Sequence, residues 1–346
     1  MTNRQYFSFA ICILLIPVFA SCSTDDRTRI LVYSPHGKEM LSMYEKAYEE
    51  QHPDVDVQWI DMGGQDAYDR IRTEAMNPQA SLWWGGAGGA FSHAADEDLL
   101  EPYTPSWANS VGNASRGAND TWFGTYLTPE VIAYNTDALD STDVPHDWDE
   151  LLDDKWNDRL LIRYPMASST MRTIYGSMIL RQPSEDEGYR WLAGLDRNVK
   201  TYTADPTQLY IRLARGEGDV TLWNLTDIFI QSVINGYPFG FKIPESGTPI
   251  LTDGIALVKG GPNLDVARSF YDMVTSDTAI VSQAHRFYRI PVRTDIDKSR
   301  LPDWMTDLDL REMPVDWDSL DAEIPRWMQY WDEHIKGRGE DYLMGN

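Results

Sequence analysis

Residues 29–37 read Arg-Ile-Leu-Val-Tyr-Ser-Pro-His-Gly, an apolar run that ends in a turn-forming Ser-Pro-His-Gly sequence. Residues 40–48 then place Met, Tyr, Ala and Tyr on one face at helical spacing. His-Pro-Asp at 52–54 ends this helix, and Val, Val and Trp alternate along 55–59 as in a half-buried strand. Strand, helix and strand in this order form a βαβ unit, which predicts an α/β protein.

The alternation of strands and amphipathic helices continues through the rest of the chain. No period of 20–50 residues recurs, which argues against a solenoid or a propeller. The apolar stripe of the last expected helix is assigned to burial against the rest of the chain rather than to a partner. Further strands are expected at 80–84, 128–134, 159–162, 199–202, 219–223 and 250–258, and helices at 66–76, 147–152, 206–215, 262–276, 279–285 and 319–335.

The composition is that of a globular and strongly acidic protein. It has 346 residues, which suggests about two domains, and its 54 Asp and Glu against 30 Lys and Arg give a net charge of −24. Binding to phosphate backbones needs a basic face, so no nucleic-acid partner is expected. Acidity also keeps a surface solvated, so a saline habitat would explain it as well as a partner would.

Both cysteines lie at the N-terminus and indicate an exported protein. Residues 10–20 form an apolar run that is too short to cross a membrane as a helix, which is typical of a signal peptide over 1–21. Phe-Ala-Ser-Cys at 19–22 resembles a bacterial lipobox, so Cys22 is predicted to be lipidated and to begin a polar tether over 22–28. Cys12 leaves with the signal peptide, so the mature protein is expected to have no disulfide and no thiolate metal site.

The usual local signatures of enzymes are missing. The chain has no G-x-S-x-G elbow, no H-E-x-x-H and no G-x-x-x-x-G-K-[ST] loop. Its six histidines are scattered, and its carboxylates are too numerous for any pair to be informative. No catalytic residue, metal or cofactor is therefore expected, although a hydrolase with a spatially assembled triad stays an alternative.

Two turns between a strand and a helix are rich in small hydrogen-bond donors. Residues 33–39 read Tyr-Ser-Pro-His-Gly-Lys-Glu, and residues 165–172 read Pro-Met-Ala-Ser-Ser-Thr-Met-Arg. Free N–H groups and the helix dipole at such turns favour an anion, whereas Ser and Thr are also ordinary helix caps. One such turn in each half of an α/β protein favours a ligand held between two lobes.

The order of these elements resembles the periplasmic solute-binding proteins of ATP-binding-cassette importers, in the branch of ferric-ion binders and binders of phosphorylated organic solutes. The resemblance implies a two-lobe periplasmic-binding-protein-like fold with a ligand cleft between the lobes. It is carried, in order, by residues 32–39, 133–136, 148–156, 165–170, 215–220 and 289–293.

Departures from the ferric binders bear on the solute. The adjacent tyrosines expected after residues 219–223 are replaced by Asn224 to Asp227, and the carboxylate expected after residues 82–84 is replaced by Gly85 and Gly86. Fe(III) prefers hard anionic oxygen ligands, which a single His36 does not supply. The glycines leave space and let a ligand approach the backbone. The resemblance therefore favours a phosphate, phosphonate or carboxylate group.

The ligand-binding residues expected on this basis come from both halves of the chain. Alternatives stay open for three of them: Trp223 in core packing, Asp227 at a helix start and Asp253 as a loop cap. An amine on the solute would explain Asp227 or Asp253, and a sugar would explain Trp223 and Asn224. The predicted set is Ser34, His36, Gly37, Gly85, Gly86, Tyr126, Ser168, Ser169, Thr170, Trp223, Asn224, Asp227 and Asp253.

The expected protein is a monomeric periplasmic or cell-surface lipoprotein that captures a small organic anion by lobe closure and delivers it to an inner-membrane ABC permease. Its membrane contact is expected through the lipid anchor only. A ferric-ion or polyamine binder and a secreted hydrolase are the alternatives. The expected division is lobe 1 over 29–126 and 254–300, lobe 2 over 127–253, and a C-terminal helical segment over 301–346 that packs on the lobes.

Overall fold

The computed structural model describes residues 26–345. The predicted signal peptide, the predicted lipidation site at Cys22 and most of the predicted tether lie outside these described residues. Within them, no helix is both long enough and apolar enough to cross a membrane.

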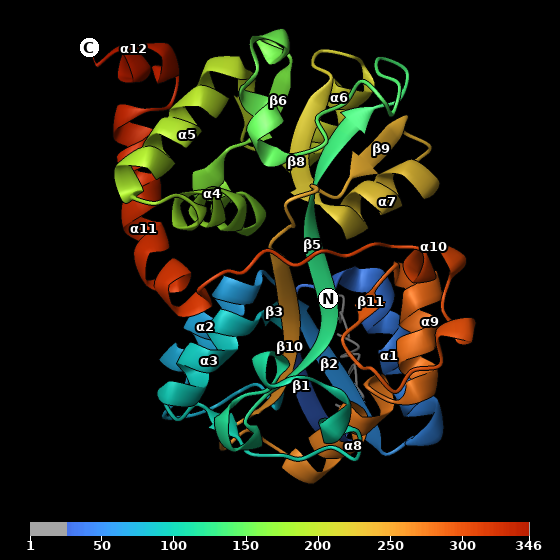
Figure 1. The fold of residues 1–346 in the computed structure, drawn as a ribbon. Helices are drawn as coiled ribbons and strands as arrows, with labels where there is room; N and C mark the ends of the chain where they lie inside the picture. The colour runs from blue at the N-terminus through green and yellow to red at the C-terminus, as the bar shows by residue number, and fades with distance from the viewer. Residues whose placement is uncertain (1–25, 346) are drawn as a thin grey trace, which may run out of the picture.

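The first lobe, at the bottom of Figure 1, opens with the predicted βαβ unit. Strand β1 (Thr28–Ser34), helix α1 (Gly37–Gln51) and strand β2 (Val55–Asp61) form it, and β1 pairs in parallel with β2 and with β3 (Leu82–Ala87). The other elements of this lobe are α2 (Gly64–Thr73), α3 (Gly88–Asp96), β4 (Leu100–Glu101), α8 (Leu264–Val274), α9 (Asp277–Phe287) and β11 (Ile290–Pro291).

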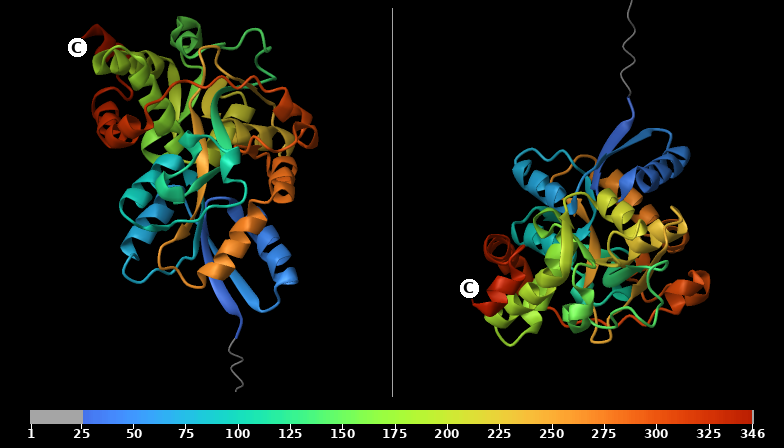
Figure 2. Two further views of the ribbon diagram at one scale, coloured as in Figure 1. Left: turned by 60° about the horizontal axis from the view of Figure 1, so that its bottom comes forward. Right: turned by 90° about the horizontal axis from the view of Figure 1, so that it is seen from above.

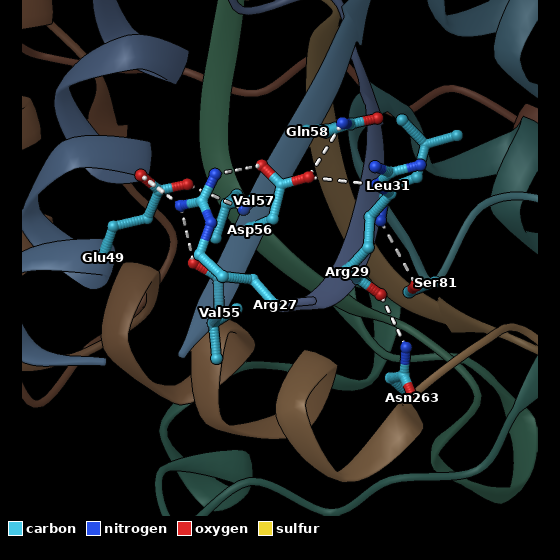
Figure 3. Close-up of polar contacts among 10 residues, drawn as sticks. All are labelled: Arg27, Arg29, Leu31, Glu49, Val55, Asp56, Val57, Gln58, Ser81 and Asn263. Carbon is cyan, nitrogen blue, oxygen red and sulfur yellow. Dashed lines mark hydrogen bonds and ion pairs between the residues drawn. The ribbon is translucent and has the colours of Figure 1, made fainter. Parts of the chain in front are cut away.

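The carboxylate of Asp56 ties the beginning of β1 to β2 (Figure 3). Asp56 is 8% exposed and accepts hydrogen bonds from Arg27 at 3.1 Å, from Arg29 at 3.0 Å and from Gln58 at 2.9 Å. A buried charge is tolerated when it is paired and hydrogen-bonded in this way. The chain is therefore fixed at the point where it enters the sheet.

Two antiparallel strands connect the lobes. Strand β5 (Phe123–Asn135) and strand β10 (Ile250–Val258) pair in the first lobe, from Phe123 with Ile255 to Pro129 with Ile250. Beyond Pro129, β5 changes partners and pairs with β8 (Val220–Asn224) and β9 (Phe239–Lys242). Proline has no N–H to donate, so it suits the point where one set of ladder bonds ends and another begins.

The second lobe is an α/β layer around the end of β5. Strand β8 pairs in parallel with β6 (Leu160–Arg163), which pairs in parallel with β7 (Val199–Thr203). The pairing path through the whole molecule is β2-β1-β3-β10-β5-β8-β6-β7, which confirms the predicted α/β class. The helices of this lobe are α4 (Ser169–Arg181), α5 (Glu185–Asn198), α6 (Pro206–Ala214) and α7 (Leu225–Val233).

The C-terminal segment returns across both lobes (Figures 1 and 2). It contains α10 (Asp303–Thr306), α11 (Trp317–His334) and α12 (Gly339–Met344). Before α11, Thr248 exchanges backbone hydrogen bonds with Arg311 and Met313 at 2.8 Å each, beside the crossing strands. Helix α11 then packs on α4 through Leu320 and Ile324, and its Trp331 is fully buried.

Each lobe has its own hydrophobic core. In the second lobe Trp148, Trp156 and Trp331 are at most 1% exposed. In the first lobe Trp83 and Trp84 are both fully buried but belong to clusters on opposite faces of the sheet. The predicted lobe boundaries at 126/127 and 253/254 fall within β5 and β10.

Several elements differ from the sequence expectation. The helix expected at 147–152 is a 3₁₀ turn over Trp148–Leu152, and the strand expected at 128–134 begins at Phe123. Strand β9 and helix α12 were not expected, because four and six residues are too few to show a periodic pattern. The remaining 3₁₀ turns are Ala108–Ser110, Asn113–Ser115, Ala118–Asp120, Asp154–Trp156, Pro165–Ala167 and Lys298–Arg300.

An ion pair between Glu185 of α5 and Arg326 of α11 fastens the C-terminal helix to the second lobe. The guanidinium donates to both carboxylate oxygens, at 2.8 and 2.6 Å, and Trp327 adds a bond at 3.0 Å. Hydrogen bonding from Arg326, together with that from Trp327, lowers the pKa of Glu185 from 4.5 to about 2.

The substitution Glu185→Gln tests this contact. A lowered folded-state pKa contributes stability above the unfolded pKa and loses it as the pH falls toward 2. Since the side chain is 39% exposed, solvent screening limits the loss at pH 7 to about 0.5–1 kcal/mol. Urea unfolding between pH 7 and 2 should show a gap between variant and wild type that closes below pH 4.5. A gap that does not depend on pH would contradict the role of the charge.

Glycine is required at two turns of the first lobe for different reasons. Gly85 has φ +102°, and a Cβ there would lie 2.7 Å from His36 Cε1 and Nε2 and 2.8 Å from Pro35 Cδ. Gly37 has φ +78°, but a Cβ there would meet nothing within 4 Å. Gly85 therefore combines backbone strain with a steric clash, whereas Gly37 carries the strain alone.

The matched substitutions Gly85→Ala and Gly37→Ala should separate these effects. Strain alone costs about 1–2 kcal/mol, so Gly37→Ala should lower the free energy of unfolding by about that amount. Overpacking adds about 1–3 kcal/mol, so Gly85→Ala should lose about 2–4 kcal/mol. Urea unfolding measures both, and equal losses would show that His36 does not restrict position 85.

Candidate functional site

The candidate site lies where the carboxyl ends of the parallel strands meet the crossing strands. In the first lobe β1 ends at Ser34 and β3 reaches Gly85 and Gly86; in the second, β6 leads into α4 and β8 leads into α7. Asp253 pairs with both Ala87 and Tyr126, and Asn224 pairs with Glu130. The sheet register therefore brings the ends of β3 and β8 to the crossing strands. Strands β1 and β6, which lead into the two donor-rich turns, are the parallel neighbours of β3 and β8.

His36 is enclosed by aromatic rings on the first-lobe side. It is 8% exposed and lies edge-on to Trp84 at 5.0 Å and to Tyr126 at 5.4 Å between ring centroids. Its Nε2 atom is buried with no hydrogen-bond partner among residues 26–345. Burial, with a further effect of the Arg289 charge, lowers the pKa of His36 well below 6.5, so the imidazole is neutral at pH 7.

The other predicted first-lobe residues mostly bind one another. Ser34 is fully buried and its Oγ accepts a bond from the His36 N–H at 3.2 Å. The space that the sequence assigns to a ligand beside Gly85 is instead filled by the His36 ring. Tyr126 is 1% exposed and donates its hydroxyl proton to Gln283.

Asp253 links the end of β3 to β5. Its Oδ1 accepts a bond from the Gly86 N–H at 3.1 Å, and its Oδ2 accepts one from the Thr128 hydroxyl at 2.7 Å. Burial raises the pKa of Asp253, and the Arg289 charge opposes this. The side chain therefore lies inside the junction and does not cap a loop.

On the second-lobe side, the start of α4 offers donors. Ser168 is the N-cap, and its Oγ accepts a bond from the Met171 N–H at 3.3 Å. Ser169 is exposed and Thr170 is half-buried, and neither hydroxyl has a hydrogen-bond partner in the described part of the chain. The role of helix cap thus belongs to Ser168, and the hydroxyls of Ser169 and Thr170 are left for other contacts.

Asp227 holds the predicted residues of β8 and α7 together. Its Oδ2 accepts bonds from Trp223 Nε1 at 3.0 Å and Asn224 Nδ2 at 2.8 Å, with the Tyr210 hydroxyl at 3.5 Å. Asn224 Oδ1 in turn accepts the Asp227 N–H at 2.8 Å and so caps α7. Trp223 is 6% exposed in the core of the lobe, and the indole and amide groups orient Asp227.

The structure also places three charged residues here that the sequence prediction did not include. Glu130 of β5 is fully buried, and neither of its carboxyl oxygens has a partner among the described residues. Arg289 lies with its guanidinium 5.8 Å from the Tyr126 ring centroid, and its buried Nε has no partner there either. Arg163, at the end of β6, donates to the Ala167 carbonyl at 3.1 Å just before α4.

Sequence signals for these residues existed but were weak. Glu130 is the only charged residue in β5, an otherwise apolar and small-residue strand. Arg289 belongs to the motif at 289–293. In both cases the neighbours that make the residue part of the site are distant in the sequence. Glu130 lies near Asp227, and Arg289 lies over the ring of Tyr126, so each pair is separated by nearly 100 residues or more.

The described residues contain no group of three or more His, Cys, Asp and Glu side chains that could hold a metal ion. Two surface hollows of the described residues lie elsewhere, one at Tyr330 and Tyr342 beside α12 and the other between α1 and α9 at Met43 and Phe287. The arrangement at the junction is therefore a set of oriented donors and acceptors contributed by both lobes.

Comparisons with known proteins agree with this architecture. The family model of the bacterial extracellular solute-binding proteins matches residues 34–280. A probable ABC transporter periplasmic-binding protein, y4fP, of Sinorhizobium fredii is 26% identical over 339 residues, which cover 93% of this chain and 90% of the relative. Another relative is a periplasmic protein of Salmonella typhimurium whose name proposes 2-aminoethylphosphonate as its ligand. It is 24% identical over 285 residues, which cover 79% of this chain and 82% of the relative.

Solved structures show the same fold. The periplasmic binding protein AfuA of Actinobacillus pleuropneumoniae, with fructose-6-phosphate bound, superposes on this chain with a TM-score of 0.73 at 23% sequence identity. The superposition covers 89% of this chain and 99% of the AfuA chain. Proteins of iron uptake and ferric-ion binding are also among the similar proteins. The expected two-lobe periplasmic-binding-protein-like fold is thus confirmed. The chain belongs to the bacterial extracellular solute-binding protein family, as the solute-binding component of an ABC transporter.

Proposed function

We propose that the solute is a small organic anion with a phosphate, phosphonate or carboxylate group, bound at the start of α4. The observation that carries the proposal is the combination of the α4 N-terminus with the unpartnered hydroxyls of Ser169 and Thr170. Free N–H groups and the helix dipole favour an anion at such a point, and hydroxyls add donors.

Two cationic side chains support this proposal. Arg163 donates a hydrogen bond to the Ala167 carbonyl, in the turn that leads into α4. Arg289 lies over the ring of Tyr126 and has no ion pair in the described part of the chain. The relatives support it too, since the names and titles of two of them specify a phosphonate and a sugar phosphate. Ligand contacts from both lobes would stabilise a closed state by their differential affinity for it.

The same proposal covers the cellular setting. The protein binds and releases its solute unchanged, as a monomer, and passes it to an inner-membrane permease. Cys22 carries the lipid that holds it at the periplasmic face or the cell surface, and the residues from 22 onward form the tether.

The double substitution Ser169→Ala and Thr170→Ala tests the anion site. Sugar phosphates, alkylphosphonates and small carboxylates are first screened by thermal shift in the presence of a chelator. A ligand at 100 times its Kd should stabilise the protein by about 2.7 kcal/mol without metal. Because hydrogen bonds to a charged group contribute about 1.5–3 kcal/mol each, the double variant should bind the selected anion at least tenfold more weakly in calorimetric titration.

Ser168→Ala is the matched control for this experiment. Loss of the cap should lower the free energy of unfolding by about 1 kcal/mol and leave the affinity nearly unchanged. Unchanged affinity in the double variant, or stabilisation that disappears entirely in chelator, would overturn the proposed anion site.

Cys22→Ala tests the lipid anchor. Two or three acyl chains hold a protein stably at a membrane, where one is marginal, so the variant should move from the membrane pellet to the soluble fraction. Fractionation and immunoblotting of cells that express the full chain measure this. If the variant sediments with membranes at the wild-type level, Cys22 is not the anchor.

A further inference from the structure

Three carboxyl side chains meet on one face of the crossing strands. Tyr126, Thr128 and Glu130 are two residues apart on β5 and so share a face of the strand. The Thr128 hydroxyl binds Asp253, which places that carboxyl on this face. Glu130 stands in register with Asn224, whose amide binds Asp227.

Glu130 is the unusual member of this group. It is 0% exposed, and neither oxygen of its carboxyl has a hydrogen-bond partner within residues 26–345. Nearly all buried polar groups in proteins have partners, and an unpartnered one costs about 1–3 kcal/mol. Burial, followed by the charges of Asp227 and Asp253, raises the pKa of Glu130 well above 4.5.

Near Glu130, Asp227 has one carboxylate oxygen that is held in place but accepts no hydrogen bond from the described residues. All three of its side-chain donors bind Oδ2, from Trp223, Asn224 and Tyr210. Its Oδ1 has no hydrogen-bond partner in the part of the chain that the structure describes. A carboxylate oriented in this way is ready to accept a bond from a cationic donor without losing further side-chain freedom.

No cation of the described residues forms an ion pair with these acids. No ion pair of residues 26–345 includes Glu130, Asp227 or Asp253, and Arg289 acts on Asp253 only from beyond ion-pair distance. The acids are also not grouped closely enough for shared ligation of a metal ion. An ammonium group needs only two or three acceptors and suits this wider arrangement.

We propose that Glu130 and Asp227 form a subsite for an ammonium group of the solute. The proposal rests on the proposed function, because it adds a cationic group to the anion expected at α4. Strands β6 and β8 are parallel neighbours in the sheet, with Leu160 paired with Val220, and they lead into α4 and α7. Both helix starts therefore lie at the carboxyl edge of the same sheet, where a small zwitterion can present one charge to each of them.

Binding of a cation should release a proton. The charged groups that face Glu130 are Asp227 on α7 and Asp253 on β10, and both favour its neutral form in the free protein. An ammonium group favours the ionised form, so the pKa of Glu130 falls on binding and its proton leaves. The affinity for an amine should consequently rise with pH in the range where the amine stays protonated.

The experiment compares matched probes that differ only in the amine. 2-Aminoethylphosphonate is titrated against ethylphosphonate, glucosamine-6-phosphate against glucose-6-phosphate, and ethylamine alone completes the set. The proteins are wild type, Glu130→Gln and Asp227→Asn, with Asp219→Asn at the opposite end of β8 as the control for loss of a lobe-2 carboxylate. Titration in two buffers of different ionisation enthalpy counts the protons released.

The expected result is that one amine probe binds wild type and Asp219→Asn at least tenfold more tightly than its amine-free partner and releases a proton. The preference, taken within each protein as the ratio of the two affinities, should disappear in Glu130→Gln and Asp227→Asn. The proton count on wild type tests the proposal even if a variant fails to fold.

The other outcomes separate the two proposals. An amine-free anion that binds as tightly as its amine partner, or a preference that survives both substitutions, overturns the ammonium subsite and leaves the anion site standing. Binding of ethylamine without any contribution from an anion overturns the anion site and supports the ammonium subsite. Binding of none of the probes overturns the ammonium subsite, and the anion site is overturned as well if the carboxylates of the first screen also fail to bind.

Discussion

The antiparallel pairing of β5 with β10 is the constraint on which the arrangement of this molecule depends. One ladder ends at Pro129, and from Glu130 onward β5 belongs to the second lobe. Strand β5 sets the register of candidate contacts on both sides of this point: Asp253 of β10 pairs with Tyr126 and also with Ala87 of β3, and Asn224 of β8 pairs with Glu130. A one-residue slip would turn the whole Tyr126–Thr128–Glu130 face away from the junction.

The same ladder would keep the lobes aligned during the closure proposed above. The connections at the crossing are backbone bonds of β5 and β10, the bond from the Thr248 hydroxyl to the Glu130 carbonyl, and the pairing of Thr248 with the segment before α11. In such a closure, rotation about a few strand residues would change the distance between α4 and His36 but would leave the strand register unchanged. Closure would thus depend on the few strand residues at the crossing, whereas the positions of the site residues depend on the strand register.

The sequence was sufficient for the fold class because strand and helix periodicities are local. The βαβ unit at 29–59 and the donor-rich start of α4 appear where the pattern predicts them. The fine structure of the site was not predictable in this way. The sequence predicts open space beside Gly85, but the His36 ring, from a turn about 50 residues earlier, occupies that space. Trp223 and Asn224, predicted to contact the solute, instead donate hydrogen bonds to Asp227. Such compensations depend on tertiary packing, which no local pattern encodes.

The charge of the whole chain gives a further reason to consider both signs at the junction. A net charge of −24 repels an approaching anion, although screening confines that repulsion to about 8–10 Å in physiological salt. An anion must therefore be attracted locally, by the start of α4, Arg163 and Arg289, against the carboxylates of Asp227 and Asp253 nearby. A solute with no net charge avoids the long-range repulsion and turns the acids from opposing charges into binding partners.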